Sequence, residues 1–190
     1  MFVNISQSDI LWRMSLGFWK KLKKPILVMA PMADVTDVAF RRMFAKYGKP
    51  DVIWSEFVSA DGLCHPQGRE RLLIDLSYTE AERPIVAQLF TGTPEKMFEA
   101  GKLVAELGFD GLDINMGCPD RSVEKQCAGA SLMKDPKRAR EIIRSAKEGV
   151  RSAGKEIPVS VKTRIGYKKN ELSTWLPELL AEEPAVITVH

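Results

Sequence analysis

Apolar positions along the chain form short continuous runs that alternate with longer segments of helical periodicity. The runs are almost continuously apolar at their start, as expected for strands that are buried on both faces. They cover residues 26–32, 51–58, 84–90, 111–118, 158–166 and 185–190. The segments of helical spacing between them cover residues 37–48, 93–108, 135–154 and 171–183. The pattern therefore predicts strands and helices in alternation.

Two of the helical segments carry signals at their ends. Asp135 is a good N-cap, and the next residue is a proline suited to the first turn, while Gly154 is a good C-terminal signal. Thr93 and Gly108 flank the preceding helical segment in the same way. We therefore expect helices that begin near residues 94 and 136.

Strands that alternate with crossover helices indicate a parallel sheet, which is either open or closed into a barrel. An open nucleotide-binding sheet favours a Gly-rich turn after its first strand, but the first run leads into APMADVTD at 30–37. Polar or reactive residues instead follow the C-terminal ends of the runs, where a (β/α)8 barrel gathers its active site. They are Met32, Asp34, Glu56, Gln88, Asn115, Cys118, Lys162, Arg164 and His190. The sequence therefore predicts an α/β TIM barrel, truncated after about six strands, over residues 25–190.

Composition narrows the class of protein. The chain has 190 residues, of which 45% are hydrophobic and 28% are charged, and no apolar run is long enough to cross a membrane. Three irregularly spaced cysteines form neither a disulfide framework nor a zinc site, so we expect reduced thiols, a cytoplasmic location and no metal. The net charge of +3 permits a polyanionic partner without requiring one.

Residues 1–24 differ in character from the rest and form an N-terminal extension. The order of charged and apolar residues is not that of a signal peptide. One interpretation takes Met14 as the true start, with the earlier residues mis-called. The other has Phe18, Trp19 and Leu22 anchor a short cap. In that case the basic residues are a solvated face rather than a nucleic-acid contact; they are Lys20, Lys21, Lys23 and Lys24.

Cys118 follows a strand end directly and lies between Gly117 and Pro119. Glycine permits a close backbone approach, and proline stiffens the exit from the turn. A thiol held there is suited to act as a nucleophile or a proton donor. Cys64 and Cys127 lack this setting, and Cys64 is not expected to pair with the adjacent His65 because neighbouring side chains rarely point at one another.

Polar side chains at the other strand ends indicate a ligand. Lys162 lies within a strand-like run, where a buried ammonium needs a partner, and Arg164 two residues later points to the same face. The amides of Gln88 and Asn115 offer both donors and acceptors, which suit the edge of a flavin or a pyrimidine ring. His190 is also a candidate because it ends a strand.

Together these segments resemble the tRNA-dihydrouridine synthase family over residues 25–190. The resemblance rests on the following segments, in this order: APMADVTDVAFRRM, SEFVSADGL, AQLFTGTPEKM, DINMGCPDRSVEKQCAGASLM, VSVKTRIG and ITVH.

The resemblance implies a flavoenzyme that reduces uridine in tRNA to 5,6-dihydrouridine, with FMN as cofactor and NADPH or NADH as electron donor. It implies that Cys118 is the general acid that protonates uracil C5, and that Asn115 and Arg164 bind the substrate. The residues implied to line the flavin are Pro31, Met32, Ala33, Gln88, Lys162 and His190.

Family members also have two further strands and a C-terminal helical domain that helps to hold tRNA. Both lie outside this sequence. We therefore expect a protein that is monomeric when full-length, and an inactive fragment for residues 1–190 alone.

Three other functions stay open at the level of sequence. One is an FMN barrel that acts on a free pyrimidine, similar to dihydroorotate dehydrogenase. Another is an aldolase-type barrel in which Lys162 forms a Schiff base. The last is a non-catalytic barrel fragment that binds RNA.

Overall fold

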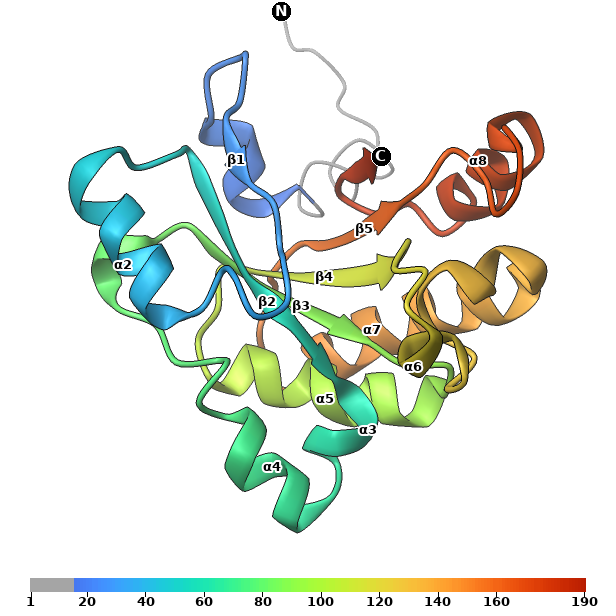
Figure 1. Ribbon diagram of the computed structural model, residues 1–190, viewed down its shortest axis with the longest axis horizontal. Coiled ribbons are helices and arrows are strands. Elements are labelled where there is room, and N and C mark those ends of the chain that lie inside the picture. Colours follow the sequence, from blue (N-terminus) through green and yellow to red (C-terminus); the bar gives the residue numbers. More distant parts are fainter. Residues whose placement is uncertain (1–15) are drawn as a thin grey trace, which may run out of the picture.

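The computed structural model describes residues 16–190 and shows a curved sheet of six parallel strands in the order β1-β2-β3-β4-β5-β6. The strands are β1 (Val28–Met29), β2 (Val52–Ser59), β3 (Ile85–Phe90), β4 (Gly111–Met116), β5 (Val159–Thr163) and β6 (Ile187–Val189). Each strand pairs with the next one along the chain, and the sheet curls into part of a barrel (Figure 1). The predicted α/β fold is confirmed, and the six parallel strands form part of a TIM barrel.

Four main helices connect the strands and follow one another around the outside of the sheet (Figure 1). They are α2 (Val38–Tyr47), α5 (Pro94–Glu106), α7 (Pro136–Ser152) and α8 (Leu172–Leu180). All four lie within the predicted segments. No helix among residues 16–190 is long and apolar enough to cross a membrane.

Shorter helices lie before β1 or in the connections between strands and were not predicted. They are η1 (Gly17–Lys21), α3 (Ala60–Leu63), α4 (Pro66–Leu72), η2 (Glu80–Glu82), α6 (Arg121–Glu124) and η3 (Gly129–Lys134). The four residues of α3 and of α6 complete little more than one helical turn, which is too short for an apolar period to show in the sequence.

The predicted helix ends agree with the structure except for one cap. The Asp135 carboxylate accepts a hydrogen bond from the Arg138 amide at 3.1 Å, and Gly154 adopts φ +68° just past α7. Gly108 adopts φ +82° just past α5. Thr93 occupies the N-cap of α5, but its side chain makes no capping bond.

The main core lies between the outer face of the sheet and the surrounding helices. Helices α5 and α7 pack closely because Gly149 allows the backbone at Phe98 to approach; a Cβ at Gly149 would lie 2.1 Å from the Phe98 carbonyl oxygen. The outer residues of β3 and β4 are apolar and fully buried in this core; they are Ile85, Ala87, Leu89, Leu112, Ile114 and Met116.

The inner face of the sheet is closed at its N-terminal end by η1. Phe18 and Trp19 stack with ring centroids 4.7 Å apart, and Trp19 lies 5.7 Å from Trp54 of β2. These side chains and Leu22 pack on Val52, Trp54 and Val86. The nearby lysines are exposed, in agreement with the interpretation of this segment as an anchored cap; they are Lys20, Lys21, Lys23 and Lys24. The alternative start at Met14 falls outside the described residues.

Candidate active site

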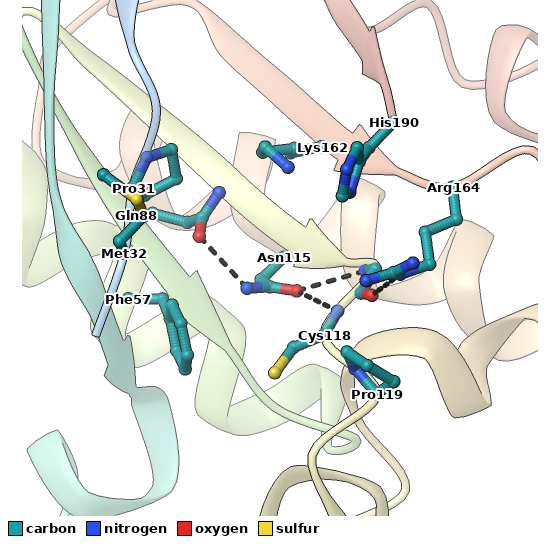
Figure 2. Close-up of a pocket in the computed structure, with 11 residues that line it drawn as sticks. Pro31, Met32, Phe57, Gln88, Asn115, Cys118, Pro119, Lys162, Arg164 and His190 are labelled. Carbon is teal, nitrogen blue, oxygen red and sulfur yellow. Dashed lines mark hydrogen bonds between the residues drawn. The ribbon is translucent and has the colours of Figure 1, made fainter. Parts of the chain in front are cut away.

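A cavity of about 220 Å³ opens where the C-terminal ends of the strands meet (Figure 2). Its lining brings together residues from β2, β3, β4 and β5 and from the segments after β1 and β6. They are Pro31, Met32, Phe57, Gln88, Asn115, Gly117, Cys118, Pro119, Lys162, Arg164 and His190. The lining includes every residue to which the family resemblance gives a role except Ala33, and the strand-end residues Asp34 and Glu56 also lie outside it.

Ala33 lies in the loop between β1 and α2, exposed and outside the lining, whereas Pro31 and Met32 of the same loop line the cavity. Two hydrogen bonds that involve Thr36 hold the loop in place. The Met32 amide donates to Thr36 Oγ1 at 3.0 Å, and Arg41 Nη1 donates to the Thr36 carbonyl at 2.8 Å.

Arg41 is itself held by a buried ion pair. Its Nε lies 2.8 Å from Glu82 Oε2, and both side chains are fully buried. Since Glu82 belongs to η2, just before β3, this pair fixes the β1–α2 loop to a different part of the fold. A buried charge that loses its partner is strongly destabilising, so both residues are needed to keep the loop in place.

Two amides join neighbouring strands on the inner face of the sheet. Asn115 Nδ2 on β4 donates to Gln88 Oε1 on β3 at 3.1 Å (Figure 2). Asn115 Oδ1 accepts the amide N–H groups of Gly117 at 3.1 Å and Cys118 at 2.9 Å. Asn115 therefore shapes the turn that carries the cysteine.

The Cys118 side chain points into the cavity, toward the side where the Phe57 ring lies (Figure 2). Its backbone is held on both sides, because its N–H donates to Asn115 and its carbonyl accepts from the Ala130 amide at 2.9 Å. The thiol is half-buried. A fixed backbone and a partly open side chain are the setting expected of a thiol that meets a ligand.

Three basic side chains face the same cavity, and none of the lining residues is acidic. Arg164 Nε donates to the Gly117 carbonyl at 2.6 Å, which places the guanidinium beside the cysteine turn (Figure 2). Within residues 16–190, the half-buried ammonium of Lys162 makes no hydrogen bond or ion pair. His190 completes the set. Such a cavity favours an anionic or electron-rich ligand.

Comparison with known proteins assigns the chain to a family. A model of the family described as "Dihydrouridine synthase (Dus)" matches residues 28–190. The chain belongs to the dihydrouridine synthase family.

Curated relatives of this dihydrouridine synthase family member come from several bacteria. The chain is 42% identical to "Probable tRNA-dihydrouridine synthase 2" of Bacillus subtilis (strain 168), over 93% of the chain and 53% of the relative. It is 38% identical to "Probable tRNA-dihydrouridine synthase" of Staphylococcus aureus (strain COL), over 93% of the chain and 52% of the relative. The chain therefore spans about half the length of the curated relatives that it matches.

The other cysteines of this family member lie outside the cavity. Cys64 Sγ is 3.6 Å from the Lys96 carbonyl, and burial raises the pKa of this thiol. Cys127 is exposed. Within residues 16–190 no group of three or more metal-ligating side chains is placed to hold a metal ion.

Sequence reasoning missed two side chains at or below the cavity. Phe57 enters the lining because the pairing of β2 with β3 shifts between Trp54 and Phe57. Glu56 consequently lies outside the lining and accepts the Asp34 amide at 2.6 Å. Asp113 on β4 is fully buried beneath the amides. The signal that identifies it is a carboxylate inside an apolar run, and Asp113 pairs in register with Gln88 on β3.

We expect Gly129→Ala to disturb the cysteine turn from behind. Gly129 adopts φ +61°, and a Cβ there would lie 2.5 Å from the Cys118 carbonyl oxygen and 2.8 Å from Val123 Cγ1. The strained backbone alone costs about 1–3 kcal/mol. Thermal unfolding should report this loss, with Gly154→Ala as the control: it has a similar positive φ, but nothing lies within 4 Å of the added Cβ. Equal losses in the two variants would show that crowding at Cys118 contributes nothing.

Proposed function

We propose that this chain carries the catalytic part of a tRNA-dihydrouridine synthase, which reduces the C5–C6 double bond of uridine in tRNA with FMN and NADPH. The observation that carries the proposal is the meeting of the Cys118 thiol, two amides and three basic side chains in one cavity. Membership of the family and the names of the relatives support the same reaction.

The residues present fit a flavin. The ammonium of Lys162, unpaired within the described residues, suits the electron-rich edge of a flavin ring, and a cation there stabilises the reduced, anionic form. Gln88 offers the second N–H of its amide to the same cavity, since Asp113 takes the first. Pro31, Met32 and His190, which line the cavity, and Ala33, which follows Met32 in the β1–α2 loop, complete the proposed flavin-binding set. When bound, the flavin supplies the hydride that uracil C6 requires.

Cys118 holds the proton that completes the reduction. Hydride addition at uracil C6 leaves an electron pair at C5, and the thiol Sγ–H delivers its proton there. The thiol suits this role because its backbone is fixed by Asn115 and Ala130. The thiolate that results is reprotonated from solvent before the next turnover.

Asn115 and Arg164 are proposed to hold the uracil beside Cys118, because both lie next to the cysteine turn in the cavity. A uridine within folded RNA must leave its stack to reach such a cavity. Arg164 Nε donates its hydrogen bond to the Gly117 carbonyl, so the remaining N–H groups of the guanidinium are available for the substrate. We further propose that the full-length protein is cytoplasmic and monomeric and that tRNA is its macromolecular partner.

The absorption spectrum and product of the complete gene product test the proposal together. We expect a yellow protein with the absorption of oxidised flavin, and dihydrouridine in unmodified tRNA after incubation with NADPH. A colourless protein that is trapped on its substrate by borohydride would favour an aldolase-type Lys162. Turnover of free dihydroorotate with no product in tRNA would favour a free-pyrimidine enzyme.

We expect a chain that ends at His190 neither to retain flavin nor to modify tRNA. β1 and β6 are the two ends of its sheet, and Leu27 and Val28 beside or on β1 are 67% and 43% exposed. Phosphate sites of such barrels usually lie in loops after the seventh and eighth strands. The measurement compares the soluble yield, the bound flavin and the dihydrouridine formed by this chain with those of the full-length Bacillus subtilis relative, expressed in the same way. A soluble, yellow and active chain would contradict this expectation.

A further inference from the structure

Asp113 lies on the inner face of the sheet, one layer below the cavity. It aligns with Gln88 of β3 and with Ser160 of β5, and its side chain is fully buried. Gln88 Nε2 donates to Asp113 Oδ2 at 2.6 Å, and Ser160 Oγ donates to Oδ1. The proposed reaction does not use this carboxyl group, because it does not line the cavity.

An ionised carboxylate only accepts hydrogen bonds, so it fixes the direction of each bond above it. The Gln88 amide must turn its NH2 group toward Asp113, which leaves its oxygen for Asn115 Nδ2. Asn115 must then turn its own oxygen toward the amide N–H groups of Gly117 and Cys118. Reversal of either amide would set two donors or two acceptors against each other.

We propose that Asp113 is a positioning residue that sets the orientation of Gln88 and Asn115, and through them the placement of Cys118. This role rests on the proposed function, in which Gln88 faces the flavin and Cys118 is the proton donor. Asp113 touches neither ligand, and it acts only through the hydrogen-bonded chain from Gln88 to the cysteine turn.

The protonation state of Asp113 provides a way to observe this chain of hydrogen bonds. Burial raises the pKa of Asp113 to about 6, while hydrogen bonds from Ser160 and Gln88 oppose that rise. The indole N–H of Trp54 on β2 makes no hydrogen bond of normal geometry within the described residues, yet it lies close enough to lower the same pKa. Lys162 of β5 is the charged group that acts on Asp113, and it also lowers the pKa.

Protonation removes the constraint on direction. A neutral carboxylic acid can donate as well as accept, so below about pH 6 the carboxyl group no longer dictates the direction of the Gln88 amide. That direction is then held only through Asn115, by the amide N–H groups of Gly117 and Cys118. Above that pH the carboxylate holds a single arrangement. We therefore expect side-chain and backbone groups along the chain to change together as the pH crosses this midpoint.

Nuclear magnetic resonance of the complete gene product, labelled with 15N, tests this expectation with and without added FMN. The side-chain amides of Gln88 and Asn115 and the backbone amide of Cys118 should shift with one common midpoint near pH 6. Asp113→Asn should abolish that midpoint. This variant also separates the titration of Asp113 from any effect of His190, an ionisable group in the same cavity.

Ser160→Ala is the matched control, because it keeps the carboxylate and its bond to Gln88. It removes a hydrogen bond that lowers the pKa of Asp113, so the common midpoint should move to higher pH. A midpoint that stays in place, or a shift at Gln88 that does not reach Asn115 and Cys118, would overturn the proposal.

Thermal unfolding distinguishes positioning from a structural role. The pKa of Asp113 is higher in the folded chain than its ordinary value near 3.8, so the ionised form at pH 7.5 opposes folding and protonation favours it. Asp113→Asn should therefore leave the Tm at pH 7.5 unchanged or raised, while dihydrouridine formation falls about 10- to 100-fold through lost positioning. A lower Tm with normal turnover would overturn the proposal. A wild-type protein without synthase activity would refute the proposed function and leave the titration as an independent result.

Discussion

Cys118→Ala is expected to reduce dihydrouridine formation on the order of 10²–10⁴-fold, the usual contribution of a general acid. Among residues 16–190, Cys118 is the only cysteine that lines the cavity, so the variant loses the cavity's one S–H proton donor. Reduction of the flavin by NADPH should stay near the wild-type rate, because that step needs no proton donor on the uracil side. Single-turnover assays with pre-reduced protein and unmodified tRNA separate the two steps.

The other two cysteines provide controls for the Cys118 experiment. Cys127→Ala removes an exposed thiol nine positions along the chain, and Cys64→Ala removes a half-buried thiol outside the cavity. Both variants should turn over at close to the wild-type rate. If Cys118→Ala is equally active, the proton comes from another group, and the assignment of Cys118 as general acid is wrong.

Lys162→Ala is expected to damage flavin binding and flavin potential together. Its ammonium is half-buried at the cavity wall without a partner among residues 16–190. Loss of one charge-assisted hydrogen bond removes about 1.5–3 kcal/mol, which corresponds to a roughly 10- to 150-fold weaker Kd for FMN. The midpoint potential should become more negative, because the reduced, anionic flavin loses a neighbouring cation.

Titration of the flavin-free protein with FMN, followed by fluorescence, measures the first effect, and spectroscopic redox titration measures the second. Lys125→Ala is the control, since Lys125 is an exposed lysine just past α6 and outside the cavity lining. Unchanged flavin affinity and potential in Lys162→Ala, with weaker tRNA binding alone, would move Lys162 from the cofactor to the substrate.

The strand and helix pattern was predictable because each strand lies in a run that is almost continuously apolar at its start. The outer residues of β3 and β4 pack under α5 and α7, while the inner ones hold the polar chemistry, and period two along the strand separates the two sets. The same spacing places Lys162 and Arg164 on one face, and the structure brings both to the cavity. A strictly regular strand is therefore well described by its sequence.

The parts that were not predictable depend on departures from regular pairing. Counting by twos from Trp54 puts Glu56 on the inner face, but the shift in pairing between β2 and β3 brings Phe57 there instead. Such an irregularity arises from neighbours that are distant in sequence, so a single strand does not reveal it. The position of Ala33 just outside the cavity lining was likewise not predictable, because the path of its loop is set by Arg41 and Glu82 rather than by local preference.

The buried pair of Arg41 and Glu82 has a practical consequence for measurements in different buffers. Ions in solution screen exposed charges but have little access to a pair with no exposed surface. The loop that carries Pro31 and Met32 should therefore keep its position as ionic strength rises, whereas contacts between lysines and RNA phosphates weaken steeply. A salt titration would then separate the proposed binding of tRNA, whose affinity falls with salt, from the proposed binding of FMN.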